Sequence, residues 1–405
     1  MKSNCIVDYD LAIVGGGIVG VTLACALKNS GLSIVIIEAQ PLEVAMTRQR
    51  AYALSLLSER IFSEIGVWEG IFPNIANFSQ IKLSDADYQK TVKFNTSDLK
   101  TEYLGYVAEH GQLLGKLQTF VEDCAQIHWL SPAKVVEVEY QDSQANLSIK
   151  MGEEIRYLRT RLVVGADGPK SPMRQAAGIA TRGWKYWQSC VTFIIRHEAS
   201  ENNVAFERFW ATGPMGILPL PGNRCQIVWT LPHAEAEAVQ QLDEEKFMAR
   251  LKRHLPDCLG KCELIGDRSV FPVQLMQSQS YVRPRLALVG DAAHCCHPVG
   301  GQGLNLGIRD AAALAEVIYK AYQQGADIGS ISVLKKYESW RKLENLTILG
   351  FTDALDRLFS NEWLPVVILR RLGLVMITHI QLFKVEALKL MTGLKGKAPA
   401  LERSL

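Results

Sequence analysis

The chain has 405 residues, of which 48% are hydrophobic and 21% are charged, enough to bury the cores of two or three globular domains. A formal net charge of +2, with no basic patch interleaved with aromatic residues, argues against nucleic acid as a partner. The nine cysteines are scattered and odd in number, which indicates reduced thiols and argues against a disulfide framework or a zinc site. We therefore expect no metal.

The first predicted element is a short apolar run over residues 9–14, which is typical of a buried parallel strand. Gly15, Gly17 and Gly20 follow with the G-x-G-x-x-G spacing, and a helix is predicted over residues 21–27. In chain order, the glycines permit a tight turn, a close approach of phosphates to the backbone, and packing of the helix on the strand. The helix N-terminus would then face a dinucleotide pyrophosphate.

The next apolar segment, residues 33–37, predicts a second strand that ends at Glu38. A carboxylate at this place would accept hydrogen bonds from an adenosine ribose and would repel a 2′-phosphate. NADP is therefore disfavoured at this site, and the first motif alone leaves FAD and NAD open.

Further along, residues 162–168 predict a strand that ends in a tight turn, which Ser171 and Arg174 can tie down by hydrogen bonds. Segments rich in β-branched and aromatic residues then predict strands, with a turn between two of them at residues 219–223. These segments cover residues 189–196, 204–210 and 225–230. Together they predict an antiparallel sheet that roofs the ligand and contains the substrate pocket.

A second glycine-rich motif follows the strand predicted over residues 285–289. Asp291 stands where a carboxylate can hold a polyol hydroxyl such as those of a ribityl chain. Residues 301–305 open another helix, whose N-terminal N–H groups and partial positive charge would stabilise an anionic pyrimidine edge of a reduced flavin. One motif alone indicates only a dinucleotide, but the two motifs together indicate FAD.

The motifs also carry a family resemblance. Residues 290–294, Pro298, 301–303 and Asn305 resemble the second FAD motif of the single-component flavoprotein aromatic hydroxylases, and residues 165–174 have that family's D-G-x-x-S-x-x-R pattern. Within the family, residues 50–55 and 104–107 resemble the branch that hydroxylates polyprenylated phenols in ubiquinone biosynthesis. The resemblance implies a fold like that of p-hydroxybenzoate hydroxylase.

The resemblance also implies roles for single residues. Arg50 would be a cation near the pyrophosphate, Asp167 would lie near the cofactor and the path of the reductant, and Gln112 would replace an arginine that many members carry near Gly111. Pro298, Gly301 and Gln302 are the expected catalytic residues beside the reactive flavin edge, whereas His294 is expected to be structural. The expected cofactor-binding set is Gly15, Gly17, Gly20, Glu38, Arg50, Gln112, Asp167, Asp291, Gly301, Gly303, Leu304 and Asn305.

The predicted fold class is α/β, with a discontinuous Rossmann-type FAD-binding domain, an antiparallel β-sheet substrate domain and a C-terminal helical tail. We expect the FAD-binding domain to comprise residues 1–75, 107–183 and 281–348. The substrate domain would comprise residues 76–106 and 184–280, and the tail residues 349–405.

The tail is apolar and basic, with six lysines and arginines against Glu386 alone between residues 363 and 397. This bias favours a membrane surface, and the alternative is a helical pair packed on the body or at a homodimer interface. No signal peptide is recognisable, and no uncharged apolar stretch reaches about 18 residues. We expect a cytoplasmic protein, peripheral on the cytoplasmic face of the membrane, with other enzymes of quinone biosynthesis as further partners.

The reaction implied is hydroxylation of the aromatic ring of a prenylated phenol. NADPH or NADH would act as a transient reductant of FAD, and O2 would supply the oxygen atom through a flavin C4a-hydroperoxide. The alternatives are a flavin-dependent geranylgeranyl reductase, a hydroxylase of a non-prenylated aromatic, and a non-enzymatic FAD scaffold. A flavin halogenase is disfavoured, because its Trp-x-Trp-x-x-Pro pattern does not occur.

Overall fold

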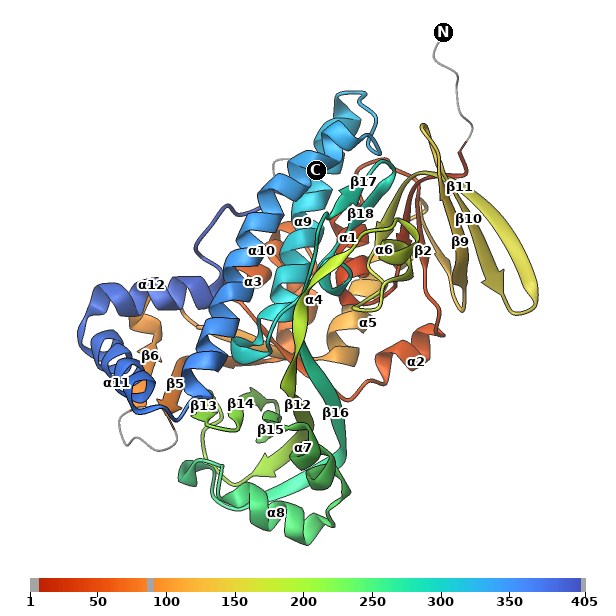
Figure 1. Cartoon of the computed structure of the whole chain (residues 1–405). Coiled ribbons are helices and arrows are strands. Elements are labelled where there is room, and N and C mark those ends of the chain that lie inside the picture. The colour runs from red at the N-terminus through yellow and green to blue at the C-terminus, as the bar shows by residue number, and fades with distance from the viewer. Residues whose placement is uncertain (1–6, 86–90, 402–405) are drawn as a thin grey trace.

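The computed structural model describes residues 7–85 and 91–401, which form two large sheets, a small sheet and a set of covering helices (Figure 1). The ends of the chain assigned above to the first domain and to the tail, residues 1–6 and 402–405, lie outside the described residues, as do residues 86–90.

The first large sheet has the strand order β17-β18-β11-β1-β2-β8, and β9 and β10 extend it beyond β11. Strands β18, β11, β1, β2 and β8 run parallel to one another, as expected for a Rossmann-type sheet. Its members are β1 Tyr9–Val14, β2 Ile34–Ile37, β8 Ile127–Leu130, β9 Lys134–Tyr140, β10 Ala145–Met151, β11 Glu154–Gly165, β17 Val282–Arg283 and β18 Leu286–Leu288. The four strand segments expected at 9–14, 33–37, 162–168 and 285–289 are confirmed. β11 starts eight residues earlier than predicted, and the bounds of the other three differ by at most one residue.

The second large sheet has the order β19-β16-β12-β15-β14-β13-β5-β6. It was predicted to be antiparallel, but it is mixed, because β5, which lies much earlier in the chain, pairs parallel with β13. Its members are β5 Gln80–Asp85, β6 Thr91–Asn95, β12 Thr181–His197, β13 Val204–Trp210, β14 Gly213–Leu220, β15 Arg224–Pro232, β16 Cys262–Ser278 and β19 His294–Cys295. The long strands β12 and β16 connect the two halves of the molecule in Figure 1.

The turn expected at residues 219–223 starts later than predicted, because β14 continues through Pro219 to Leu220. Pro219 has no N–H to donate to a neighbouring strand. It is tolerated here because β13 pairs with β14 only as far as Ile217, so no strand lies beside Pro219 on the β13 side.

The small sheet has the order β3-β7-β4, formed by β3 Ala51–Leu54, β7 Gly105–Glu109 and β4 Ala76–Phe78. The α-helices are α1 Ile18–Ala26, α2 Leu42–Met46, α3 Leu56–Ile65, α4 Trp68–Ile71, α5 His110–Glu122, α6 Pro172–Ala176, α7 His233–Gln241, α8 Glu244–Lys252, α9 Gln302–Gln323, α10 Ile331–Phe359, α11 Leu364–His379 and α12 Gln381–Thr392. Short 3-10 turns are η1 Phe72–Asn74, η2 Thr96–Asp98, η3 Asp257–Leu259, η4 Gly290–Ala292 and η5 Val299–Gly301. The boundary expected between residues 348 and 349 falls inside α10.

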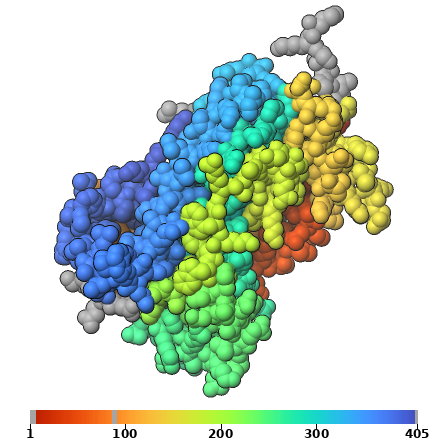
Figure 2. Space-filling view, viewed as in Figure 1, coloured from red at the N-terminus to blue at the C-terminus, as the bar shows by residue number. Residues whose placement is uncertain are grey.

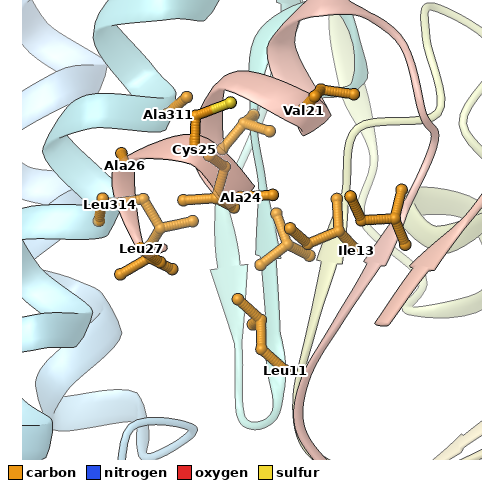
Figure 3. Packing of buried hydrophobic residues seen from close by; sticks show 14 of the residues in the cluster. Leu11, Ile13, Val21, Ala24, Cys25, Ala26, Leu27, Ala311 and Leu314 are labelled. Carbon is orange, nitrogen blue, oxygen red and sulfur yellow. The ribbon is translucent and has the colours of Figure 1, made fainter. Parts of the chain in front are cut away.

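The main core lies between α1, α9 and the parallel sheet. Figure 3 shows Ala24 and Cys25 of α1 near Ala311 of α9, with Leu11 and Ile13 of β1 nearby, and all five are buried. The small side chains on both helices let α1 and α9 approach closely, and this contact brings the beginning of the chain against its last third.

Candidate functional site

Three loops that the sequence singled out follow three adjacent parallel strands. β18, β11 and β1 are neighbours in the sheet, with Val14 beside Gly165 and Gly165 beside Leu288. Their carboxyl ends therefore meet at one edge, which is where ligands bind in open α/β sheets. The structure thus brings the first, middle and last motifs together.

The glycines of the first motif act for different reasons. Gly15 has a φ of +113°, and a Cβ there would overlap the carbonyl of Ala166. A Cβ on Gly20 would overlap the carbonyl oxygen of Gly15, so Gly20 allows α1 to pack against the turn. Gly17 differs, because no atom lies within 4 Å of where its Cβ would be. Gly17 therefore borders open space.

The N-terminus of α1 opens onto this space without a capping side chain. Gly17 is the N-cap residue, and it cannot supply a side-chain acceptor for the first-turn N–H groups. Glu38, at the end of β2, instead accepts hydrogen bonds from the N–H of Gly16 at 2.7 Å and of Gln40 at 2.9 Å. The free N–H groups can bind an anion.

The second motif packs directly on the first. Val19 of α1 lies between Gly290 and Gly307, and a Cβ on Gly290 would be 3.3 Å from Val19 Cγ1. Position 307 must also be glycine, since a Cβ there would lie 2.6 Å from Val19 Cγ2. The two glycine motifs therefore form one continuous surface.

The middle motif connects to both. Ser171 caps α6 by accepting from the N–H of Arg174, and the Arg174 guanidinium donates to the carbonyl oxygens of Pro169 and Ala292, each at 2.8 Å. The expected tie between Ser171, Arg174 and the turn is confirmed, and it extends to the second motif. Asp167 accepts from the N–H of Met173 at 3.0 Å, while its Oδ1 is buried with no hydrogen-bond partner among the described residues. Burial raises the pKa of Asp167.

Asp291 occupies a concave position. Its side chain is exposed to solvent, yet desolvation by the surrounding protein raises its pKa, against the opposing charges of His294 and Arg50. The carboxylate is therefore reached by solvent while protein atoms surround it. Arg50 lies with its guanidinium 4.4 Å from the ring centroid of Phe271 on β16, so it faces the second sheet as well as Asp291.

The segment before α9 holds two consecutive glycines in the left-handed region, Gly300 at a φ of +66° and Gly301 at +62°. Gly301 is the N-cap of α9 and has no side chain to cap it, so the N–H groups of the first turn, at Gln302, Gly303 and Leu304, have no capping side chain. Gly303 and Leu304 are half-buried in this turn. The Gln302 amide instead donates to the carbonyls of Gly300 and of Met391 on α12, and its Oε1 is buried with no partner among the described residues.

The side chain of Asn305, a residue expected to bind the cofactor, makes its hydrogen bonds within the protein. Its Oδ1 accepts from Ser55 N–H and from the Ser58 hydroxyl, and its Nδ2 donates to the carbonyls of Ala53 and Gly301, at 2.7–2.8 Å. These four bonds use the full capacity of the amide. Asn305 therefore holds α9 against β3 and the start of α3. Gln112 lies exposed in the first turn of α5.

Behind His294 lies a buried ionic network. Asp310 accepts hydrogen bonds from His294 at 2.6 Å, from Arg341 at 2.9 Å and from Asn345 at 3.0 Å, and also from the N–H of Gly290 at 3.1 Å. His294 is 1% exposed, which agrees with the structural role expected for it. The network fixes the second motif to α9 and α10.

An apolar cavity lies between the second sheet and the η5 segment. Pro298, Gly301 and Met391 contribute to its wall, and Glu207 of β13 and Thr230 of β15 are the polar residues among those that line it. The remaining lining residues are Ala53, Phe78, Ile81, Ala205, Phe206, Pro214, Gly216, Leu218, Val228, Val299 and Gly300. Glu207 was not singled out from the sequence, although an acid inside the apolar run of residues 204–210 was a visible signal.

The whole arrangement fits FAD. Open space beside Gly17, uncapped N-termini on α1 and α9, an accessible Asp291 in a cleft and the unpartnered Asp167 Oδ1 all face the edge where the three motifs meet. An apolar cavity next to the α9 N-terminus provides room for an aromatic molecule. Among the described residues, no group of three or more His, Cys, Asp and Glu side chains is placed to hold a metal.

Comparisons with known proteins agree with this geometry. Residues 8–345 match the family model described as an FAD-binding domain. The chain is 55% identical to a Synechocystis protein over 97% of this chain and 95% of that one. It is 37% identical to the ubiquinone hydroxylase UbiL of Rhodospirillum rubrum, over 90% of this chain and 85% of the relative. It is 33% identical to the 3-demethoxyubiquinol 3-hydroxylase of Escherichia coli, over 95% and 98% of the two chains.

The fold also matches that of the p-nitrophenol 4-monooxygenase of Pseudomonas putida, with a TM-score of 0.83, 19% identity and coverage of 96% of this chain and 98% of that one. At this identity the likeness establishes the fold.

Proposed function

The chain belongs to the FAD-binding family of flavoprotein aromatic hydroxylases, and from that premise we propose that it hydroxylates the ring of a polyprenylated phenol in the biosynthesis of ubiquinone or a similar quinone. That the protein is an FAD-dependent monooxygenase follows from the family match and from relatives that cover nearly its full length. The substrate is inferred from the two relatives whose names specify ubiquinone or demethoxyubiquinol as the molecule hydroxylated.

The observation that best supports the proposal is the apolar cavity beside the N-terminus of α9. A prenylated phenol needs an apolar environment for its ring and an approach to the cofactor that excludes water, because a wet site would release hydrogen peroxide. The cavity wall supplies such an environment, with Pro298 and Gly301 on the side of the cofactor motifs.

We assign the binding roles as follows. The pyrophosphate would lie at Gly15, Gly17 and the N-terminus of α1, and Asp291 would hold the ribityl hydroxyls. The first-turn N–H groups of α9 would hold the pyrimidine edge. Bound FAD, reduced by NAD(P)H, supplies the redox and oxygen chemistry, and the protein's own groups orient the phenol and exclude water.

The direct test is NAD(P)H oxidation in air by the FAD-loaded protein, with and without 2-geranylphenol as a short-chain probe. We expect the phenol to stimulate oxidation and the product to gain one oxygen atom by mass spectrometry. A product that gains two hydrogens would assign the protein to the prenyl reductases. A matched reaction with a non-prenylated phenol measures how much of the stimulation depends on the prenyl chain.

The C-terminal helices form the second part of the proposal. Within the described residues no single helix is long and apolar enough to cross a bilayer, while α11 and α12 together would meet that criterion but are bent by 101° at their junction. Leu364, Ile368, Leu372 and Met376 recur every four residues of α11 and are all exposed, which places them along one broad side of the helix. Ile380, directly after the helix, is also exposed. Figure 2 shows α11 and α12 in dark blue at one side of the molecule.

The positive charge of the tail should contribute less to membrane binding than its composition suggested. Arg370 and Arg371 pair with Asp85, Lys384 pairs with Asp98, and Lys389 and Lys395 both pair with Glu386. Five of the six basic residues therefore have an acidic partner, but the three carboxylates balance only three of the six charges. We propose that the α11 face inserts into a lipid bilayer surface through its apolar side chains, close to the source of a prenylated substrate.

This proposal predicts that the double substitution Ile368→Glu, Leu372→Glu removes binding to phosphatidylcholine vesicles in a flotation assay. A matched control is Val136→Glu, Ile155→Glu, because these side chains have similar exposure but lie on β9 and β11, away from the tail. Salt should weaken the binding of the unaltered protein only modestly, since three of the six basic charges are balanced within the protein. A dimer that the first double variant converts to a monomer, with no vesicle binding by either protein, would instead assign the face to a homodimer interface.

A further inference from the structure

Glu207 is a carboxylate in an apolar cavity with few partners. Its Oε2 accepts one long hydrogen bond, 3.4 Å from the N–H of Gly300, and among the described residues it makes no ion pair. Gly216 faces it across β13 and β14, and even a Cβ at position 216 would come within 3.8 Å of Oε2. The side chain is half-buried and lines the cavity.

The surroundings of Glu207 contain few other charges. Neither β14 nor η5 carries a titratable residue. On β5, Lys82 lies with its ammonium 5.5 Å from the ring centroid of Phe206, and Asp85 is paired with Arg370. Burial raises the pKa of the Cys190 thiol on β12, and this thiol is also close enough to feel the charges of Arg50, Glu207 and Asp356. Desolvation raises the pKa of Glu207 itself to about 7, and the Gly300 N–H opposes this.

Its position relates it to the cofactor site. Pro298, Gly300 and Gly301 border the same cavity, and Gly301 begins α9, whose N-terminus belongs to the cofactor motifs. A phenol that enters this cavity with its ring toward α9 meets one side chain that can accept its hydroxyl proton, because Thr230 already contacts the Cys190 thiol at 3.4 Å and is a far weaker base.

We propose that the Glu207 carboxylate binds the substrate's phenolic hydroxyl and accepts its proton as the ring is oxygenated; this inference rests on the proposed function. The O–H bond of the phenol breaks, a new O–H bond forms on Glu207, and the electron pair released enters the ring and enriches the carbon that takes the oxygen atom. When that carbon loses its own proton, the phenol oxygen takes a proton back from Glu207. The net reaction consumes O2, NAD(P)H and one proton, and yields water, NAD(P)+ and the hydroxylated product.

The first test measures binding without turnover. The probes are 2-geranylphenol and its methyl ether, 2-geranylanisole, which lacks the hydroxyl proton. The FAD-loaded wild-type protein should bind the phenol about tenfold or more tightly than the ether, the ratio expected for a hydrogen bond to a charged group. Glu207→Gln should reduce this ratio severalfold, whereas Glu201→Gln, an exposed carboxylate just before β13, should leave it unchanged.

The second test is the pH profile of product formation. In the wild-type protein, hydroxylation of 2-geranylphenol should rise as pH increases through about 7, because Glu207 must be ionised to accept a proton. In Glu207→Gln this rise of the rate near pH 7 should disappear. The rate of hydroxylation should be about 100-fold below that of the wild-type protein, which is the lower end of the range for a general base. That rate should then recover toward pH 10, where the phenol ionises by itself.

Glu207→Asp keeps a carboxylate and should still show a rise of the rate near pH 7. Its rate of product formation should lie between those of the wild-type protein and Glu207→Gln. The proposal would be overturned by a Gln variant that keeps the wild-type rise near pH 7 and the wild-type rate, or by loss of flavin from both the Gln and the Asp variants, which would make Glu207 structural. An absence of oxygenated product from the wild-type protein would instead reject the proposed function, so the two failures are distinguishable.

Discussion

Gly17→Val should yield a folded protein that no longer binds FAD. Gly17 has φ −75° and ψ 177°, an extended conformation that valine adopts readily, and no protein atom lies within 4 Å of its Cβ position. The valine side chain would therefore enter only the space in front of the α1 N-terminus. If the pyrophosphate lies there, affinity should fall by more than about 100-fold, which corresponds to about 2.7 kcal/mol.

Flavin absorbance of the purified protein and a titration of the apoprotein with FAD measure this effect, and the melting temperature of the apoprotein shows whether the fold is intact. Gly350→Val is the matched control, because Gly350 in α10 also has nothing within 4 Å of its Cβ position. Gly20→Ala provides the contrast: its Cβ would overlap the Gly15 carbonyl, so the apoprotein itself should be destabilised. A Gly17→Val protein that retains stoichiometric FAD would exclude the pyrophosphate from this position.

Asp310→Asn should destabilise the protein by about 3–5 kcal/mol, the usual effect of removing one partner from a buried ion pair. Asp310 and Arg341 are 0% and 1% exposed, and the substitution would leave the Arg341 charge in the interior with Glu344 at the rim as its remaining carboxylate partner. Chemical denaturation at pH 7 measures the loss. Asp243→Asn, which breaks the exposed pair with Lys246, should leave the denaturation midpoint nearly unchanged.

The same residue predicts a pH dependence. Burial alone would raise the pKa of Asp310, but the charges of His294 and Arg341 outweigh it and lower the pKa to about 2. An unfolded aspartate has a pKa of about 3.9. The stabilising contribution is therefore complete above about pH 4 and is lost as pH falls from about 4 toward 2. The wild-type protein should lose stability through this window, and Asp310→Asn should lose less of it.

The sequence predicted the strands and helices that carry the cofactor motifs well, because their signals are local. A strand, a glycine spacing, a helix and a terminal acid lie within residues 9–38, and α1 and β2 form as that pattern indicates. The helix predicted to open at residues 301–305 is likewise present as α9, while the roles of Asp291 and of the α9 N-terminus remain predictions.

The parts that were missed depend on contacts between distant segments. The hydrogen bonds of the Asn305 side chain were not predicted, because their partners Ser55 and Ser58 lie about 250 residues earlier in the chain. The parallel pairing of β5 with β13 and the place of Glu207 in the cavity likewise follow from tertiary packing. The ion pairs that reduce the positive charge of the tail were not predicted, because two of the acidic partners, Asp85 and Asp98, lie in the first quarter of the chain.

The order of strands β18-β11-β1 has a consequence for how the protein is made. The first motif is synthesised early. β18, which pairs with β11, and Gly290 and α9, which pack on the first motif, are translated only after more than two thirds of the chain. Until then β11 has an unpaired edge, and α1 lacks the helix that covers it. Long-range pairing of this kind is slow and leaves apolar surface exposed in the meantime. Flavin uptake should therefore come at the end of folding, and flavin fluorescence during refolding would time the arrival of the C-terminal third.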